Sequence, residues 1–182
     1  MSLRAYFTDT IKIAEAHFTR AANTTAYTAG QVISDGATTH MMKFANASRA
    51  SGYGAGRGGY ITKVRIFTDN KSWTGKMRLY LYNLNETGVS IPADAALMTT
   101  IYADRAARLG YIDVGTMAND DSGANSTGAY VEAALPQPFA YEVAATVQPN
   151  GDDAIYGVLV VENGATPTSG QNFSVELTFH RA

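Results

Sequence analysis

The chain has 182 residues, 46% of them hydrophobic, and a formal net charge of −2 at pH 7, which suits one domain with a buried core. The absence of cysteine excludes a disulfide framework and thiolate metal sites. No apolar run approaches the roughly 18 residues of a membrane span, and the first ten residues lack the apolar core of a secretion signal, so we expect a soluble protein made in the cytoplasm.

The first ten residues, MSLRAYFTDT, form a predicted N-terminal arm that precedes the first strand-like run. Tyr6 and Phe7 in this arm are apolar groups that a free tail has no reason to expose. We expect the arm to pack on a neighbouring subunit, and the alternative is that it packs on its own domain. Residues 11–182 are predicted to form that single domain.

Nine strand-like runs follow the arm, and residues that favour turns separate them. Short strands without long connecting helices predict an all-β fold, an antiparallel β-sandwich of the jelly-roll type with about eight or nine strands. The helical candidate is ADRAARLG at 103–110, a single turn that Gly110 closes. The predicted strands are 11–18, 40–45, 60–68, 76–84, 97–103, 111–117, 139–147, 154–162 and 172–180.

The segment GYGAGRGGY at 52–60 contains the spacing Gly54-x-Gly56-x-x-Gly59, which resembles a dinucleotide-binding pattern. Such a pattern binds phosphate only where it opens a helix, because the free N–H groups and the dipole of the helix hold the anion. Residues 60–68 instead alternate with the period of a strand. We therefore interpret the glycines as a flexible connector and expect no nucleotide cofactor.

Two successive predicted strands carry basic and aromatic residues at alternate positions. In residues 60–68 strict alternation places Ile61, Lys63 and Arg65 on one side of the strand. In residues 76–84 the same alternation places Arg78, Tyr80 and Tyr82 on one side. If the two strands are neighbours, their polar groups form one basic, tyrosine-bearing surface that suits a partner protein, a glycan or single-stranded nucleic acid. The alternative is that this face packs against the second sheet with its tyrosine hydroxyls hydrogen-bonded. The candidate partner-binding residues of this surface are Lys63, Arg65, Arg78, Tyr80 and Tyr82.

The sequence carries no recognisable catalytic or metal-binding pattern. His17, His40 and His180 lie far apart without metal-ligand spacing, and a Gly-x-Ser-x-Gly elbow is absent. The acidic pairs at 120–121 and 152–153 lack the spacing of an EF-hand and leave open only adventitious or structural calcium. We expect no catalytic residue, no metal and no cofactor.

The charges are unevenly distributed along the chain. Residues 1–82 hold eleven Lys and Arg against four acids, a charge of +7, and residues 83–182 hold three against twelve, a charge of −9. One interpretation is that these charges neutralise one another across neighbouring strands. The other is a two-signed surface that docks beside copies of the chain or on a charged lattice.

Several segments, in their order and spacing, resemble a family of structural proteins of tailed bacteriophages that includes capsid cement or decoration proteins with jelly-roll folds. The resemblance runs from about residue 19 to the end of the chain. The segments are TRAANTTAYTAGQVI (19–33), GGYITKVRI (58–66), MRLYLYN (77–83), IYADRAARLGYIDV (101–114) and IYGVLVVENGATPTSGQNFSVELTF (155–179).

The resemblance implies a non-enzymatic protein that binds the outside of a capsid shell as a dimer or trimer. Its partners would be the major capsid protein and copies of itself, with no nucleic acid and no membrane, and it would reside on the virion surface after synthesis in the host cytoplasm. The alternative function is a carbohydrate-binding jelly-roll module of a phage tail or fibre that uses Tyr80, Tyr82 or Trp73.

Overall fold

The computed structural model describes residues 11–36, 41–45, 47, 58–119, 128–142 and 154–181. The predicted N-terminal arm, with Tyr6 and Phe7, and the glycine-rich segment up to residue 57 lie outside these residues. The elements are β1 (Ile11–Thr19), β2 (Gln31–Ile33), β3 (Met42–Ala45), β4 (Gly58–Thr68), β5 (Lys76–Tyr82), the 3₁₀-helix η1 (Tyr102–Ala106), β6 (Arg108–Thr116), β7 (Ala118–Asn119), β8 (Ala129–Glu142), β9 (Ala154–Val161) and β10 (Asn172–Arg181).

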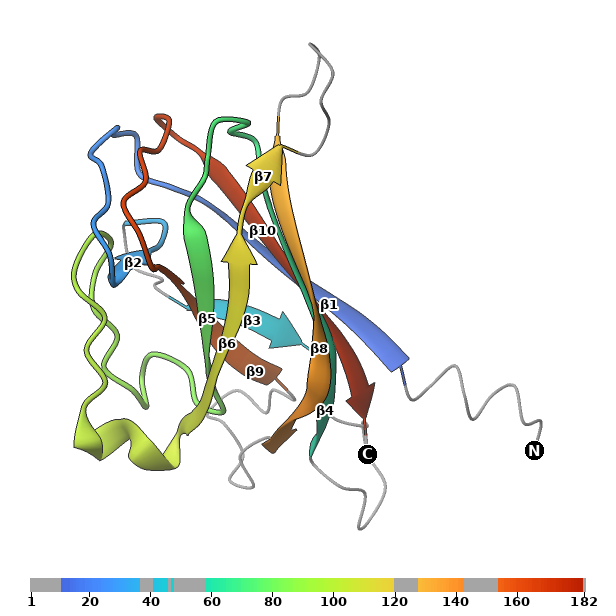
Figure 1. The fold of residues 1–182 in the computed structure, drawn as a ribbon. Coiled ribbons are helices and arrows are strands. Elements are labelled where there is room, and N and C mark those ends of the chain that lie inside the picture. Colours follow the sequence, from blue (N-terminus) through green and yellow to red (C-terminus); the bar gives the residue numbers. More distant parts are fainter. Residues whose placement is uncertain are drawn as a thin grey trace.

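Two antiparallel sheets pack face to face (Figure 1). The first sheet has the strand order β1-β10-β4-β8-β7, and the second has the order β2-β9-β5-β6, with β3 also paired to β9. The chain passes repeatedly from one sheet to the other, so that β10 lies between β1 and β4 while β9 lies between β2 and β5. This is the jelly-roll arrangement, and it confirms the predicted fold class.

The main core fills the space between the two sheets. Alternation along β10 sends Phe173, Val175, Leu177 and Phe179 inward, and all four are fully buried. Trp73, in the connection between β4 and β5, is also buried, and its ring meets the edge of Phe173 at 5.3 Å between centroids. A buried ring of that size contributes to stability through burial of its apolar surface.

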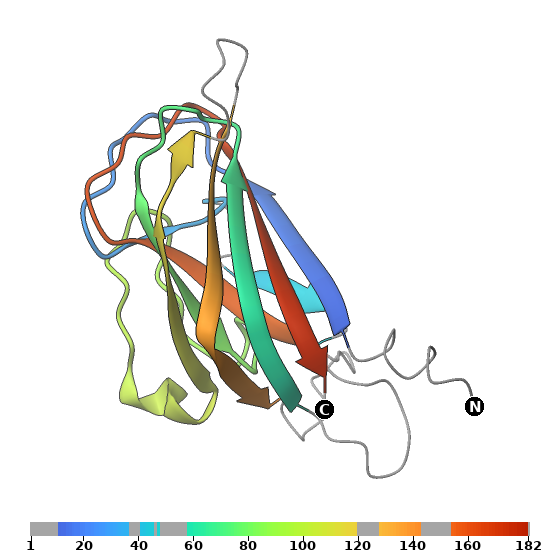
Figure 2. The same cartoon turned by 45° about the vertical axis from the view of Figure 1, so that its right-hand side comes forward.

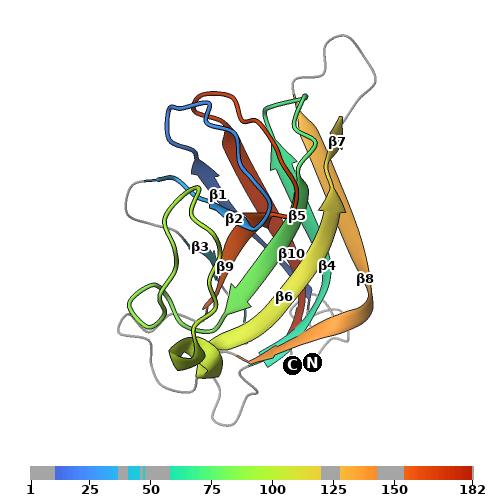
Figure 3. The same cartoon turned by 60° about the vertical axis from the view of Figure 1, so that its left-hand side comes forward.

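A second, smaller core lies on the outer side of the second sheet. The long connection from β5 to β6, residues 83–107, crosses that side of the sheet (Figure 3). Its Val89 and Ala107 pack with Tyr82 and Val158 of the sheet, and Val32 belongs to the same cluster. Because this cover adds to the main core, every residue of β9 is buried.

The structure corrects two of the predicted strands. Residues 97–101 form no extended strand: Leu97 makes only an isolated antiparallel bridge with Gln31 of β2, and η1 follows. Of the predicted strand 139–147, residues 139–142 are the end of β8, which begins at Ala129, and residues 143–147 lie outside the described residues. Pro136 and Pro138 conceal the strand in the sequence, and they lie where the pairing of β8 with β4 shifts register, a position that tolerates proline.

Two local irregularities also depart from the sequence pattern. The predicted helical turn is present as η1, but it ends before Arg108, where β6 begins, so Gly110 lies in a strand and does not close the turn. In β4 the register with both neighbours shifts near Thr62. This bulge turns Ile61 into the core, on the opposite side from Lys63, where strict alternation predicts the same side.

Candidate functional site

The predicted basic surface does not exist as one patch. Lys63 and Arg65 lie on β4 in the first sheet, whereas Arg78, Tyr80 and Tyr82 lie on β5 in the second sheet. The condition for a single patch, that the two strands are neighbours, is therefore not met. The reason is topological: the connection between them crosses from one sheet to the other, as the jelly roll requires, and does not form a hairpin.

On the first sheet, the two cations are paired with carboxylates of adjacent strands. Lys63 Nζ lies 3.2 Å from Glu132 Oε1, and Arg65 donates a short hydrogen bond to Glu132 and lies 3.5 Å from Glu176 Oε2. These hydrogen bonds hold the pKa of Glu132 below its usual range. Because the cations are satisfied within the chain, they offer little attraction to a partner.

On the second sheet, Arg78 is held between two acids and an aromatic ring. Its Nε lies 2.6 Å from Asp113 Oδ1, its Nη2 lies 3.4 Å from Glu162 Oε2, and its guanidinium carbon lies 4.3 Å from the centroid of the Tyr111 ring. The hydrogen bond to Asp113 is the main reason why the pKa of Arg78 is raised. Tyr80 is half-buried and packs at 5.6 Å from Tyr111, between ring centroids. These groups form one fixed cluster.

Tyr82 is only 2% exposed, which removes it from the candidate partner-binding residues. Alternation does send Tyr82 away from the main core, as the sequence predicts, but the 83–107 connection then covers it. Burial raises the pKa of Tyr82 to about 12. The second core therefore holds the phenol in its neutral form.

This pKa gives an alkaline stability prediction. An unfolded tyrosine ionises near pH 10, and the folded Tyr82 retains its proton up to about pH 12, so the free energy of unfolding is expected to fall as the pH rises between these values. Titration of the phenolate absorbance measures this group as a step near pH 12. In a Tyr82→Phe variant, that step should be smaller. If Tyr82 ionised near pH 10, as in the unfolded chain, its burial would be disproved.

The described ion pairs connect the basic and acidic parts of the chain. Each of them joins a cation from residues 1–82 to an acid from residues 83–182. Antiparallel pairing of strands that are distant in sequence thus places opposite charges side by side. These contacts favour the interpretation that the uneven charges neutralise one another within the fold.

A different surface stands out, one that the sequence pattern did not identify. We call it the tyrosine face and define it as the exposed side chains Ile101, Tyr102 and Tyr111, which lie on the covering connection and on β6, the strand that follows it. Tyr102 is 78% exposed and Tyr111 is 51% exposed. The guanidinium of Arg105 lies 4.0 Å from the centroid of the Tyr102 ring. The segment of the sequence that could have indicated this surface is LMTTIY (97–102). It has the residue pattern of a strand, but the structure leaves several of its apolar groups exposed.

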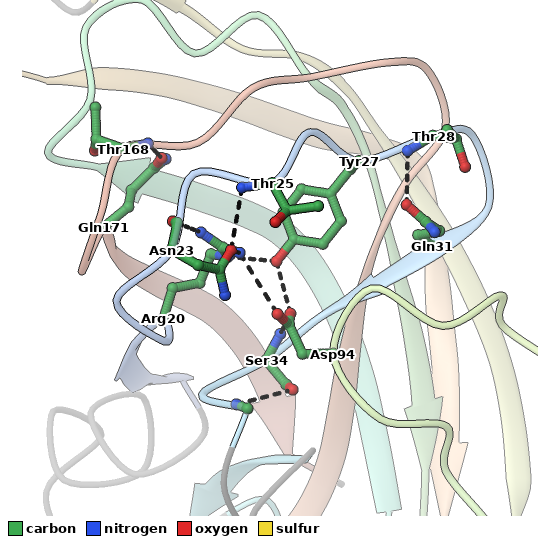
Figure 4. Close-up of polar contacts among 11 residues, drawn as sticks. Arg20, Asn23, Thr25, Tyr27, Thr28, Gln31, Ser34, Asp94, Thr168 and Gln171 are labelled. Atoms are coloured by element: carbon green, nitrogen blue, oxygen red, sulfur yellow. Dashed lines mark hydrogen bonds and ion pairs between the residues drawn. The ribbon is translucent and has the colours of Figure 1, made fainter.

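A buried polar cluster anchors the connection that carries much of this face (Figure 4). Asp94 Oδ1 accepts hydrogen bonds from the Tyr27 hydroxyl at 2.6 Å and from the Ser34 backbone N–H at 3.0 Å. Arg20 donates to the Tyr27 hydroxyl, and its Nη2 lies 3.5 Å from Asp94 Oδ2. Burial is the main reason why the pKa of Tyr27 is raised. Arg20 and Tyr27 are almost inaccessible, so the cluster is structural.

The part of the chain that the structure describes contains no group of three or more His, Asp or Glu side chains placed to hold a metal ion. Among those same residues, no helix has the length and apolar character needed to cross a membrane.

Comparison with known proteins leaves the family open. No family model matches the chain, and no curated protein matches it. Among solved structures, the chain is similar to the Human Polyomavirus 7 VP1 pentamer, at 8% identity, with 96% of each chain covered and a TM-score of 0.25. At that TM-score the similarity adds nothing to what the strand order says about the fold, and the resemblance to tailed-bacteriophage proteins stays a prediction.

Proposed function

We propose that the chain is a non-enzymatic virion structural protein, a capsid decoration protein that binds the head shell of a tailed bacteriophage through protein contacts. The order of its segments supports the family, and its jelly-roll fold agrees with that family's fold. The observation that carries the proposal is the tyrosine face, which offers a protein partner exposed apolar area beside arginines.

The composition of the tyrosine face is that of a binding hot spot. Tyrosine and arginine are enriched among residues that dominate interface energies, because they combine large area with hydrogen-bonding groups. Arg78 and Arg105 lie over the rings of Tyr111 and Tyr102, so both tyrosines are held before binding. A surface ordered in advance loses less conformational entropy when it docks.

The partners proposed for this face are the major capsid protein and copies of the chain. Arg78 already has two carboxylate neighbours, so attachment is expected to depend on buried apolar area more than on charge. This differs from the sequence-based hypothesis, in which a basic, tyrosine-bearing surface binds the partner. The proposed location remains the capsid surface.

A capsid-binding titration tests the proposal with matched variants. Tyr102→Ala with Tyr111→Ala removes two exposed tyrosines from the tyrosine face, and Tyr60→Ala with Tyr130→Ala removes two from the first sheet. Truncation of hot-spot residues typically costs about 2 kcal/mol or more, so the first pair should weaken binding to intact heads of the encoding phage by at least tenfold. The second pair should leave binding nearly unchanged. Equal effects of both pairs, or no effect of the first, would refute this docking surface.

The alternative, a carbohydrate-binding module of a tail or fibre, loses most of its predicted residues. Trp73 is 1% exposed in the main core, and Tyr82 is covered by the second core. Of the three rings named for that function, only Tyr80 remains partly accessible, and it packs on Tyr111. Recognition of a sugar would therefore need other residues.

A further inference from the structure

A small depression lies on the outer face of the first sheet, opposite the tyrosine face. It has a volume of about 190 Å³ and is placed where β1 and β4 end and β10 begins, on the side that faces the viewer in Figure 2. Its outward-facing side chains are His17, Phe67, Asp69, Asn172 and Ser174.

The strand register explains why these side chains meet. His17 of β1, Ser174 of β10 and Phe67 of β4 lie directly opposite one another across the sheet, and Tyr130 of β8 continues the row. The rings of Phe67 and Tyr130 stack at 6.1 Å between centroids, with 20° between their planes. The sheet thus holds an aromatic wall in a fixed orientation beside the depression.

The polar edge of the depression is also fixed in orientation. The backbone N–H of Asn172 donates to Asp69 Oδ1 at 3.0 Å, and its side-chain Nδ2 donates to Asp69 Oδ2 at 2.5 Å. The hydroxyl of Thr19 donates to Asn172 Oδ1 at 2.6 Å, which establishes which way the amide points. Both the carboxylate and the amide are therefore positioned before any ligand arrives.

These two groups retain hydrogen-bonding capacity. A carboxylate oxygen can accept two hydrogen bonds, and each Asp69 oxygen accepts one from Asn172. The Asn172 Nδ2 has two N–H donors and uses one of them on Asp69. The edge can thus both accept from and donate to adjacent hydroxyl groups of one ligand.

A sugar ring matches this combination of surfaces. One side of a hexose presents C–H groups that pack on an aromatic ring, and its rim presents hydroxyls that both donate and accept. The charges select among sugars, because Asp69 lies at the depression and Glu15 accepts the hydrogen bond of Ser174 at its border. Two carboxylates disfavour an anionic sugar.

We infer that the depression formed by His17, Phe67, Asp69, Asn172 and Ser174 is a binding site for a neutral hexose of a glycan. Phe67 packs on the apolar side of the ring, and Asp69 and Asn172 bind its hydroxyls. This site is separate from the tyrosine face, so a decoration protein that carried it would present a glycan-binding surface on the opposite sheet.

The test is an NMR titration of the full chain, labelled with ¹⁵N, with the methyl glycosides of glucose, galactose, mannose and N-acetylglucosamine. At the ligand efficiency of small molecules, at least one of them should bind with a Kd on the order of 1 mM and shift the backbone amides of Asp69, Asn172 and Ser174. N-acetylneuraminic acid, which is anionic, should bind more weakly.

Phe67→Leu and Asp69→Asn should each weaken this binding about fivefold, the equivalent of one lost contact, while Tyr60→Leu on the same sheet should not. If Asp69→Asn does not fold, Phe67→Leu alone tests the inference. No saturable binding of any neutral glycoside, binding that ignores Phe67→Leu, or a preference for the anionic sugar would overturn the inference. Phe67→Leu should leave capsid binding unchanged, so failure of this site and failure of the docking proposal are distinguishable.

Discussion

Asp94→Ala is expected to lower the free energy of unfolding by about 4 kcal/mol, because it leaves a buried cation without its countercharge. Arg20 is 3% exposed, and the substitution would leave its guanidinium with only the Tyr27 hydroxyl and Asn23 as partners. The Ser34 N–H and the Tyr27 hydroxyl would each also lose an acceptor.

Asp113→Ala is the matched control, because Asp113 also pairs with an arginine but its side chain is half exposed. Loss of an exposed ion pair typically costs about 0–1 kcal/mol. Chemical denaturation of both variants measures the difference. Nearly equal losses would show that water reaches Asp94 and that the cluster does not anchor the 83–107 connection.

Gly157→Ala is expected to lower the free energy of unfolding by about 3 kcal/mol, at the upper end for overpacking of a core. Gly157 lies in the middle of β9, and a Cβ added there would stand 2.8 Å from Phe44 Cε2 and 2.9 Å from Leu79 Cδ1. Those distances are well inside van der Waals contact, and both neighbours are fully buried, so neither can move away freely.

The control for that variant is Gly164→Ala, because a Cβ at Gly164 would meet its nearest neighbour, the Tyr27 carbonyl oxygen, at 3.8 Å. We expect this control to change stability by less than about 1 kcal/mol. Thermal or chemical unfolding compares the two variants. If Gly157→Ala were as stable as its control, the core between β3, β5 and β9 would have to be looser than its geometry indicates.

The sequence predicted those strands whose two faces meet different environments. β10 alternates without interruption because Phe173, Val175 and their successors face the core while Ser174 and Glu176 face water. The beginning of β8 was missed because Pro136, which follows it, is atypical of a strand. Proline is tolerated there because the pairing of β8 with β4 shifts register at that point, and the sequence of β8 alone does not show this shift. Residues 97–101 misled for the opposite reason, because their apolar groups are spaced as in a strand, but Leu97 makes only an isolated bridge with Gln31 and both Leu97 and Ile101 are exposed.

The candidate sites were harder to predict than the fold because they depend on pairing between distant segments. The periodicity of β4 showed that Arg65 faces outward, but it could not show that Glu132 and Glu176 flank it on the two neighbouring strands. Likewise the direction of Tyr82 was predictable, whereas its cover was not. The hexose site joins side chains from three strands, and no local pattern links them.

The position of β10 between β1 and β4 has a consequence for synthesis on the ribosome. β1 is translated early, yet the strand that pairs with it, residues 172–181, is translated after every other described strand. Until then β1 has no partner in the described sheets, and one edge of β4 is open. Such long-range pairing slows folding, and unpaired strand edges invite association between nascent chains. A chain that stalled before residue 172 would therefore hold β1 and β4 apart and would be a substrate for chaperones and not a folded domain.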